Sequence, residues 1–216
     1  KALISLAGPA NKQGRIAADN ICGGNSHFHG SQGSSVLKLF GLTAASTGIN
    51  EKAAQAAGIA YDKVVLFPAS HAAYYPGARS MTMKVLYEKE SLRLLGAQIV
   101  GGDGVDKRID VLATAIRAKM TALELTELDL SYAPPYSSAK DPVNMAGFMI
   151  EDLESGKVRQ FHWSDVEALP HDGSITLLDV RTAWEYQRGH LDGFRNIPLD
   201  DLREHLDELD RGKPVY

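Results

Sequence analysis

The sequence predicts an α+β domain with an antiparallel sheet and helices, followed by a shorter α/β unit. Apolar residues alternate along residues 81–88, and residues 92–100 follow as a second strand, so the two should form a hairpin. Residues 105–120 then repeat apolar side chains at the helical period. After Ser155-Gly156, strand-like and helix-like segments alternate, which indicates a parallel sheet.

Composition indicates a globular protein that binds neither nucleic acid nor membranes. Of 216 residues, 44% are hydrophobic, which is enough to bury a core. A net charge of −4 without basic clusters argues against a nucleic-acid surface, and no apolar run approaches the roughly 18 residues of a membrane span. The single cysteine excludes an internal disulfide and fits a reducing compartment, so we expect a cytoplasmic protein.

Residues 1–24 predict a strand over 2–7, a turn at Gly8-Pro9 and a helix over 10–22. Such a turn points free backbone N–H groups and the positive end of the helix dipole at an electron-rich ring or a phosphate. The other interpretation is a plain strand–helix junction. Cys22 is expected to be a buried small apolar residue, because no second cysteine or adjacent base supports a nucleophile.

Two motifs suggest ligands that the surrounding sequence does not support. His27 and His29 are spaced like metal ligands, but no carboxylate or cysteine follows nearby, so we predict a loop over Asn25–Gly33 and no metal site. Gly101–Gly104 resembles a phosphate loop, but no Gly-Lys-Ser/Thr follows, so we interpret it as a turn.

The other elements of the first domain follow from their start and stop signals. Two strands with a turn at Gly41, a short helix and a further strand are predicted over 34–47, 51–57 and 61–68. Helices are also predicted over 121–128 and 142–154. The expected N-caps of the three helices are Asn50, Thr121 and Asp141.

The segment Ser131–Asn144 is the main candidate for a functional site. Pro134 and Pro135 fix φ and remove two backbone donors, so this stretch should be a stiff, extended loop. Such a loop holds its side chains still, and it presents Tyr132 and Tyr136. The alternative is a rigid connector whose tyrosines fill gaps between helices.

A second segment, His71–Ala78, has the same character, with Tyr74 and Tyr75 ahead of Pro-Gly. A phenol can donate a hydrogen bond to a thiolate or a developing anion while its ring packs on apolar surface. Two presented tyrosines could therefore serve one anionic centre, although spacing does not prove that the two segments meet.

These residues resemble a known family. The motifs are Leu6–Asn20, Ala45–Gly48, Tyr74–Ala78, Gly104–Asp110 and Ser131–Asp141. They resemble the C-terminal part of flavin-dependent pyridine nucleotide-disulfide oxidoreductases, nearest to coenzyme A-disulfide reductase, NADH oxidase and NAD(P)H-dependent persulfide reductase. Residues from about 158 onward resemble a rhodanese domain through Leu177–Arg181, Glu185 and Gly189–Pro198.

The resemblance implies three parts. Residues 1–24 would be the tail of an FAD-binding domain, residues 25–155 a dimerisation domain, and residues 158–216 the N-terminal part of an incomplete α/β rhodanese-like domain. The parent protein would be a homodimer that uses FAD, NAD(P)H and coenzyme A to reduce a small disulfide or persulfide.

The resemblance also implies roles for particular residues. Ala7, Gly8, Pro9 and Ala10 would face the isoalloxazine ring. Tyr74 and Tyr132 would reach across the dimer to the partner's active site, near the reacting sulfur and the coenzyme A pantetheine. A phenol with a pKa of about 10 stays protonated at neutral pH and can protonate a leaving sulfur.

The catalytic cysteines of both implied domains are expected outside this chain, and Cys22 matches neither position. Since Lys1 is not a methionine and opens no signal peptide, we expect a piece of a longer protein, inactive by itself. The alternatives are a non-catalytic dimerisation module with a rhodanese-like binding domain, or an oxidase or peroxidase that uses oxygen or peroxide. The sequence leaves open the acceptor and the choice between NADH and NADPH.

One ion pair is expected in the C-terminal unit. Asp179 and Arg181 end a predicted strand, and Glu185 follows Arg181 by one helical turn. We expect Arg181 and Glu185 to form a structural pair, with a substrate-binding arginine as the alternative.

Overall fold

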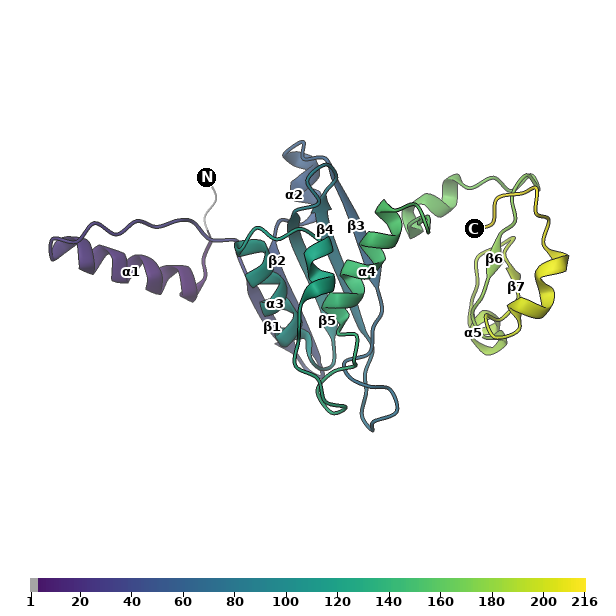
Figure 1. The fold of residues 1–216 in the computed structure, drawn as a ribbon, viewed down its shortest axis with the longest axis horizontal. Helices are drawn as coiled ribbons and strands as arrows, with labels where there is room; N and C mark the ends of the chain where they lie inside the picture. Colours follow the sequence, from purple (N-terminus) through teal and green to yellow (C-terminus); the bar gives the residue numbers. More distant parts are fainter. Residues whose placement is uncertain (1–3) are drawn as a thin grey trace. The chain divides into compact units, whose positions relative to one another are not determined.

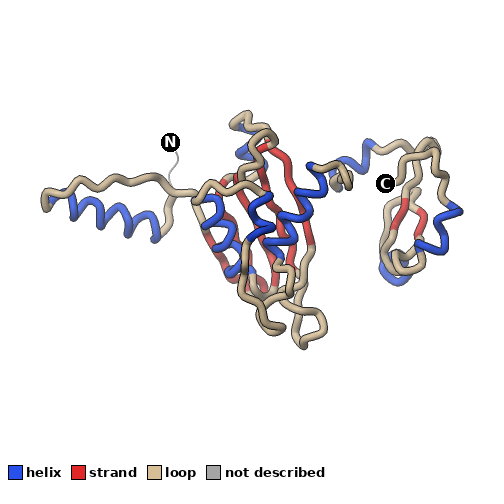
Figure 2. Tube along the Cα trace, viewed as in Figure 1, coloured by secondary structure: helices blue, strands red, loops and turns tan. Residues whose placement is uncertain are grey.

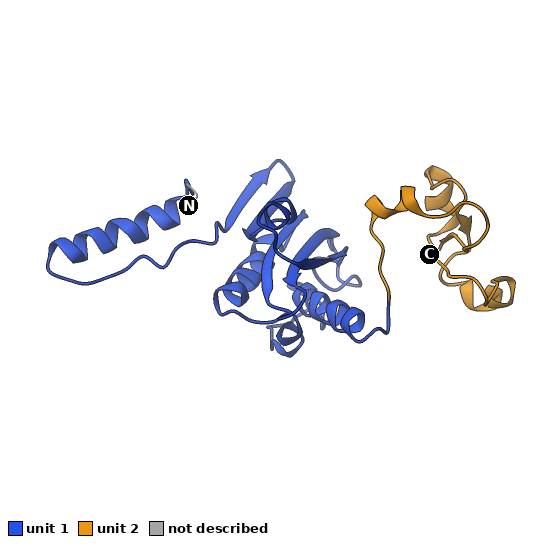
Figure 3. Ribbon diagram, turned by 90° about the horizontal axis from the view of Figure 1, so that it is seen from above, with its two compact units in different colours: residues 1–158 blue, residues 159–216 orange. Residues whose placement is uncertain are grey.

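The computed structural model describes residues 4–216. The described residues fall into two compact units, which meet between Val158 and Arg159 in the sequence (Figure 3). Each unit is described by itself. Within the described residues, no helix is both long enough and apolar enough to cross a bilayer.

The first unit is built on a five-stranded antiparallel sheet in the order β1-β2-β5-β4-β3 (Figures 1 and 2). Its strands are β1 (Ser35–Leu39), β2 (Leu42–Gly48), β3 (Tyr61–Leu66), β4 (Met81–Glu88) and β5 (Leu94–Gly101). The predicted hairpin of β4 and β5 and the predicted pair of β1 and β2 are both confirmed. The first domain therefore has the α+β class that its sequence predicts.

Two helices cover one face of this sheet, α3 (Val105–Arg117) and α4 (Pro142–Glu154) (Figure 1). Alternate residues of β4, from Met81 to Tyr87, are buried in the same cluster as Ile109, Leu112 and Ile150 of the helices. Each such large apolar side chain contributes about 1.5–3 kcal/mol when it is fully buried. The core thus lies between the sheet and the two helices.

Two of the three predicted N-caps, Asn50 and Asp141, are confirmed, whereas the N-cap of the third helix is Ala122 and not Thr121. Asn50 accepts a hydrogen bond from the Ala53 N–H, and Asp141 accepts one from the Val143 N–H. Thr121 and Glu124 make the expected reciprocal capping bonds. The helix that they start is a 3₁₀ helix over Leu123–Glu127, since a single short turn is where 3₁₀ geometry is common.

The N-terminal prediction is wrong in part. Residues 1–3 lie outside the described residues, residues 4–6 are not in a strand, and α1 (Ala7–Ile21) already includes Gly8 and Pro9. A proline is tolerated in a first helical turn because its missing N–H would have no intrahelical partner there. No residue of α1 is buried, and Cys22 is exposed, so the expectation of a buried cysteine is also wrong.

The second unit has the predicted parallel pairing in a smaller form. Its elements are η2 (Trp163–Ala168), β6 (Leu178–Asp179), α5 (Ala183–Arg188), β7 (Arg195–Asn196) and η3 (Leu202–Glu208). Strands β6 and β7 are parallel, and an isolated parallel bridge joins Thr176 to Val215. The alternation of strands and helices expected after Ser155-Gly156 starts later than the sequence indicates, because residues 158–162 form no strand.

The predicted Arg181–Glu185 ion pair is wrong. Arg181 instead pairs with Asp179, with 2.6 Å between Nη2 and Oδ2, and also donates to the Gly189 carbonyl. The Glu185 carboxylate accepts hydrogen bonds from the N–H and the hydroxyl of Thr182 in a capping box. The capping box therefore occupies the Glu185 carboxylate, which the sequence predicted to pair with Arg181.

A second charged cluster attaches the short helix α2 (Glu51–Ala56) to the sheet. The Glu51 carboxylate binds the ammonium groups of Lys63 on β3 and Lys84 on β4, and the Tyr61 hydroxyl donates to it. Partial burial alone would raise the pKa of Glu51, but the hydrogen bonds from these three groups outweigh it and lower the pKa to about 2.

This shift predicts how acid destabilises the domain. Because the folded-state pKa of Glu51 is lower than its ordinary value of 4.5, its stabilisation should be complete above pH about 4.5 and be lost as pH falls through about 2. In thermal unfolding, the difference in Tm between wild type and Glu51→Gln should therefore shrink across that window.

Glu90→Gln is the matched control, because Glu90 is an exposed glutamate in the turn between β4 and β5. Glu90→Gln should leave Tm close to that of wild type, because substitutions at exposed positions usually change stability by less than about 0.5 kcal/mol. A Glu51→Gln difference that is the same at neutral pH and at pH about 2 would contradict the assigned pKa shift.

Candidate functional site

Two loops meet at one end of the sheet (Figure 1). Residues 67–80 connect β3 to β4, and residues 128–141 connect the 3₁₀ helix to α4. A backbone hydrogen bond of 3.0 Å from the Ala72 N–H to the Ser137 carbonyl joins the loops directly. The two tyrosine segments found in the sequence are therefore neighbours.

The hydroxyl oxygens of Tyr74 and Tyr132 lie 2.8 Å apart, at hydrogen-bond distance. Both rings are accessible, with 76% of Tyr74 and 46% of Tyr132 exposed. The hydrogen bond with Tyr74 raises the pKa of the Tyr132 phenol, as expected if Tyr132 is the donor. The structure thus brings together the two tyrosines that the sequence singled out.

The mutual hydrogen bond determines what the pair can offer to a ligand. A phenol has one O–H, so when one tyrosine donates to the other, only the second hydroxyl can still donate outward. Accepting a hydrogen bond polarises that second hydroxyl and strengthens it as a donor. The pair can therefore supply one reinforced proton donor to an anion.

The proline loop is more tightly turned than its sequence predicts. The N–H groups of Tyr136 and Ser137 both donate to the Ala133 carbonyl, at 2.9 Å and 3.1 Å. This closes a turn over Pro134, Pro135 and Tyr136, so the prediction of a uniformly extended loop is wrong. Proline is favoured in such turns because its fixed φ suits the second position.

A buried ion pair lies at the base of this loop. The Arg108 guanidinium of α3 is 1% exposed and lies 3.0 Å from the Asp141 carboxylate, measured from Nη2 to Oδ2. Burial alone would raise the pKa of Asp141, but hydrogen bonds from the Val143 N–H and the Ser137 hydroxyl, with the charge of Arg108, lower it. The pair is therefore ionised at neutral pH.

Gly104 makes room for this arginine. It lies at the N-cap of α3 with φ of +69°, and a Cβ there would be 2.2 Å from Arg108 Nη1. The Gly104 carbonyl accepts a hydrogen bond of 3.2 Å from the same nitrogen. The predicted turn is shorter than expected, because Gly101 still belongs to β5 and only residues 102–104 bend toward α3. Gly104, at the end of this bend, leaves the space that the Arg108 side chain occupies.

Sequence reasoning missed Arg108 and Ser137. A signal for the arginine was present, since Arg108 lies between Val105 and Ile109 on the apolar stripe of α3, where a charge is unexpected. Ser137 gave no signal, because serine is ordinary in a loop.

The residues predicted to face a flavin form the first turn of α1. Its N-cap, Leu6, provides no side-chain cap, and the first turn carries no acidic residue. The space where a Gly8 side chain would stand is open. The turn can therefore accept an electron-rich edge close to its N–H groups, but the assignment of Ala7–Ala10 stays a prediction.

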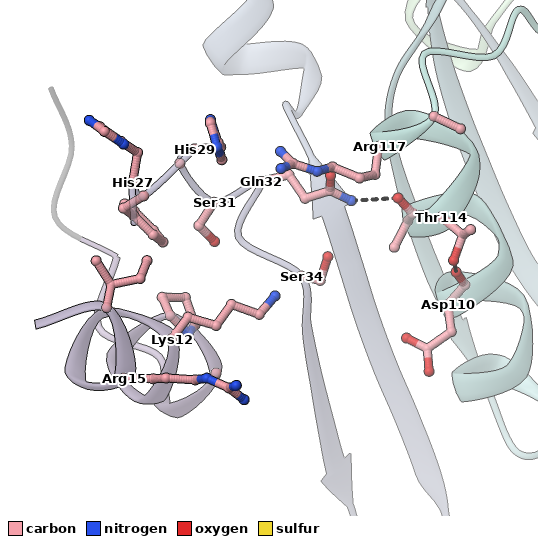
Figure 4. Close-up of a pocket in the computed structure, with 17 residues that line it drawn as sticks. Lys12, Arg15, His27, His29, Ser31, Gln32, Ser34, Asp110, Thr114 and Arg117 are labelled. Carbon is pink, nitrogen blue, oxygen red and sulfur yellow. Dashed lines mark hydrogen bonds between the residues drawn. The ribbon is translucent and has the colours of Figure 1, made fainter. Parts of the chain in front are cut away.

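A cleft of about 890 Å³ lies away from the tyrosines, between α1, residues 27–34 and α3 (Figure 4). Lys12 and Arg15 line it from α1, and Arg117 lines it from α3. Packing does not fix the wall that α1 provides, because α1 buries no side chain, so the tyrosine pair is the better-defined candidate site. Within residues 4–216, no three His, Cys, Asp or Glu side chains are grouped to hold a metal ion.

Comparison with known proteins identifies the first unit. Residues 35–142 match the family model of the pyridine nucleotide-disulphide oxidoreductase dimerisation domain. The chain belongs to this oxidoreductase family. Residues 162–216 match the model of the rhodanese-like domain, so the oxidoreductase domain is followed by a rhodanese-like one.

Individual relatives agree with this assignment. Coenzyme A disulfide reductase of Staphylococcus epidermidis is 40% identical over 148 residues, which is 68% of this chain and 33% of that protein. The structure titled reduced Bacillus anthracis CoADR-RHD is 47% identical, with a TM-score of 0.91 over 100% of this chain and 39% of that one. An NAD-dependent persulfide reductase from A. fulgidus is 40% identical, with a TM-score of 0.89 over 99% and 38%.

The chain thus spans about a third of the length of the curated relatives that it matches. The matched region includes both Tyr74 and Tyr132. These similarities establish family and fold, and they leave the roles of Tyr74 and Tyr132 as predictions.

The buried pair predicts a large loss of stability when one charge is removed. Asp141→Asn leaves the Arg108 guanidinium buried without a counter-charge, so we expect a loss of about 3–5 kcal/mol in the free energy of unfolding of the oxidoreductase domain. Urea titration followed by circular dichroism measures it.

The control is Asp62→Asn, which removes a partly exposed carboxylate that lies 3.9 Å from Lys89 and accepts a hydrogen bond from the Lys63 N–H. Exposed pairs contribute at most about 1 kcal/mol, so this variant should remain close to wild type. Equal losses of unfolding free energy in the two variants would show that the buried Arg108–Asp141 pair stabilises the domain no more than the Asp62–Lys89 pair does.

Proposed function

We propose that the chain is part of an FAD- and NAD(P)H-dependent oxidoreductase that reduces coenzyme A disulfide or a coenzyme A persulfide. The observation that carries the proposal is the pair of exposed, mutually hydrogen-bonded phenols of Tyr74 and Tyr132. Two relatives support the substrate class, since one is named a coenzyme A disulfide reductase and another a persulfide reductase.

The first turn of α1 would hold the flavin. Its uncapped N–H groups and the absence of a side chain at Gly8 fit the electron-rich edge of an isoalloxazine ring. FAD, when bound, supplies the electrons that NAD(P)H delivers for reduction of a sulfur–sulfur bond. The residues of this chain supply binding, orientation and proton donation.

The phenols suit the chemistry of a sulfur leaving group. Cleavage of a sulfur–sulfur bond leaves negative charge on one sulfur, and a positioned O–H stabilises that charge or protonates it. Tyr74 is the more exposed of the two, at 76% against 46%, so we assign its hydroxyl as the outward donor and the Tyr132 hydroxyl as the donor in the bond between them. Tyr74 would therefore touch the sulfur, and Tyr132 would support it from behind.

A second copy of the protein would complete the site. Both tyrosines are exposed at the end of a domain whose family model is that of a dimerisation domain. An exposed phenol is a weak catalyst in water, because the solvent competes for its hydrogen bond, and covering it increases its effect. We propose that the pair acts in trans, at the active site of the partner subunit.

This proposal predicts a homodimer. Sedimentation equilibrium of the full-length protein should give twice the chain mass, because a specific interface buries at least about 1,000 Å² and is commonly two-fold. A strict monomer at micromolar concentration would exclude the dimer and, with it, action of the tyrosines in trans.

The tyrosines predict a graded loss of turnover in the full-length enzyme. Tyr74→Phe keeps the ring and removes the outward donor, so kcat should fall. The activation free energy should rise by less than the roughly 2.7–4 kcal/mol that one oxyanion-hole donor contributes, because sulfur accepts hydrogen bonds more weakly than oxygen. The fall in kcat should be smaller in Tyr132→Phe than in Tyr74→Phe. The double variant should lose less than the product of the single losses, because the two phenols act as one unit.

Turnover with coenzyme A disulfide and with coenzyme A persulfide is measured anaerobically, beside flavin reduction by NAD(P)H, which should not change. Tyr136→Phe is the control, because Tyr136 is exposed in the same loop as Tyr132. Wild-type turnover in both Tyr74→Phe and Tyr132→Phe would return the two segments to the role of rigid connectors and favour a non-catalytic dimerisation module.

A further inference from the structure

The Arg108 guanidinium donates hydrogen bonds to four different residues. Its guanidinium donates to the Asp141 carboxylate, to the Ser137 hydroxyl at 3.1 Å, and to the Tyr136 carbonyl at 3.4 Å. A fourth contact goes to the Gly104 carbonyl. The side chain thus binds three points of the proline loop and the start of its own helix.

The two tyrosines are connected to this arginine by short paths. Tyr132 precedes Ser137 in the same loop, and the turn that begins at Ala133 contains two prolines, so this path is stiff. Tyr74 follows Ala72, whose N–H donates to the Ser137 carbonyl. Ser137 therefore links Arg108 to both segments, through its hydroxyl on one side and its carbonyl on the other.

The arginine itself is out of reach of any substrate. With 1% of its surface exposed, it cannot contact a ligand at the tyrosine hydroxyls. Its charge is also balanced locally by Asp141. Any effect of Arg108 on the reaction must therefore pass through the position of the loop.

We propose that Arg108 is the positioning residue for the Tyr74–Tyr132 hydroxyl pair. The planar guanidinium group holds the Tyr136 carbonyl and the Ser137 hydroxyl of the proline loop in place. The position of the loop in turn fixes the distance between the two phenols. The inference rests on the proposed function for its catalytic consequence, while the positioning itself is a property of this chain.

A lysine cannot replace the arginine in this role. An ammonium group is a compact charge at the end of a flexible stem and can pair with Asp141, but it cannot reach the serine, the tyrosine carbonyl and the carboxylate in one plane. Arg108→Lys therefore keeps the buried charge and removes the fork. Ser137→Ala removes only the hydroxyl between Arg108 and Asp141.

The test follows the tyrosine ring carbons by NMR in the chain labelled with ¹³C at the phenol carbon of tyrosine. The signals of Tyr74 and Tyr132 are assigned from their single Phe variants. In Arg108→Lys and in Ser137→Ala, the pKa of the Tyr132 phenol should move to the value found in Tyr74→Phe, because the hydrogen bond between the phenols is lost.

Tyr87→Phe is the control for general destabilisation. It removes the hydrogen bond from a buried tyrosine to Glu154 at the other end of β4, so it should lower Tm and leave the Tyr132 titration unchanged. In the full-length enzyme, Arg108→Lys should lower kcat by up to about 100-fold with little change in KM, as expected for a misplaced group.

An unchanged Tyr132 titration in folded Arg108→Lys and Ser137→Ala overturns the inference. So does an equal shift in Tyr87→Phe, or a failure of both variants to fold, which would make Arg108 a requirement of the domain as a whole. If the titration moves as expected while Tyr74→Phe and Tyr132→Phe turn over like wild type, the positioning role is supported and the proposed function fails.

Discussion

The buried ion pair of Arg108 and Asp141 is the interaction on which one end of the oxidoreductase domain depends. Asp141 caps α4 through the Val143 N–H, and Arg108 extends from the first turn of α3. The pair thus joins the two helices that cover the sheet. It also lies beneath the loop that carries Tyr132. The apolar core determines how the helices pack, and the ion pair determines how the chain runs between them.

An ion pair in this position is not explained by stability alone. Removing two charges from water costs several kcal/mol per ion, and apolar residues of similar volume often stabilise a protein equally well. The ion pair differs from apolar residues in that its hydrogen bonds are directional. The guanidinium donates to a hydroxyl, two carbonyls and a carboxylate at defined angles, and apolar contacts would leave a loop of this length several conformations. No buried side-chain nitrogen or oxygen among the described residues lacks a partner, so the network is fully satisfied.

Sequence patterns predicted the elements of this domain well, because each pattern reflects a local cause. Alternation along β4 and the helical period of α3 arise from burial of one face, and the Asp141 cap arises from unpaired N–H groups at a helix start. Contacts between distant segments were less accessible. The two tyrosine segments were found, but their hydrogen bond joins residues 58 positions apart, and nothing local encodes it. The Arg181–Glu185 prediction failed for a related reason, since Thr182 competes for the same carboxylate at a shorter range.

Under the proposed function, there is a physical reason for a site that combines a buried hydrogen-bond network with an exposed pair of phenols. A hydrogen-bond donor that acts on a developing charge must be held still beforehand, since reorganisation during the reaction would use up its advantage. Here the rigid parts lie below the surface, at Arg108 and Ser137, while Tyr74 and Tyr132 remain uncovered. Such an arrangement lets a second surface close over the phenols without disturbing their positions. A donor pair that was itself buried in one domain could not reach a sulfur held by another.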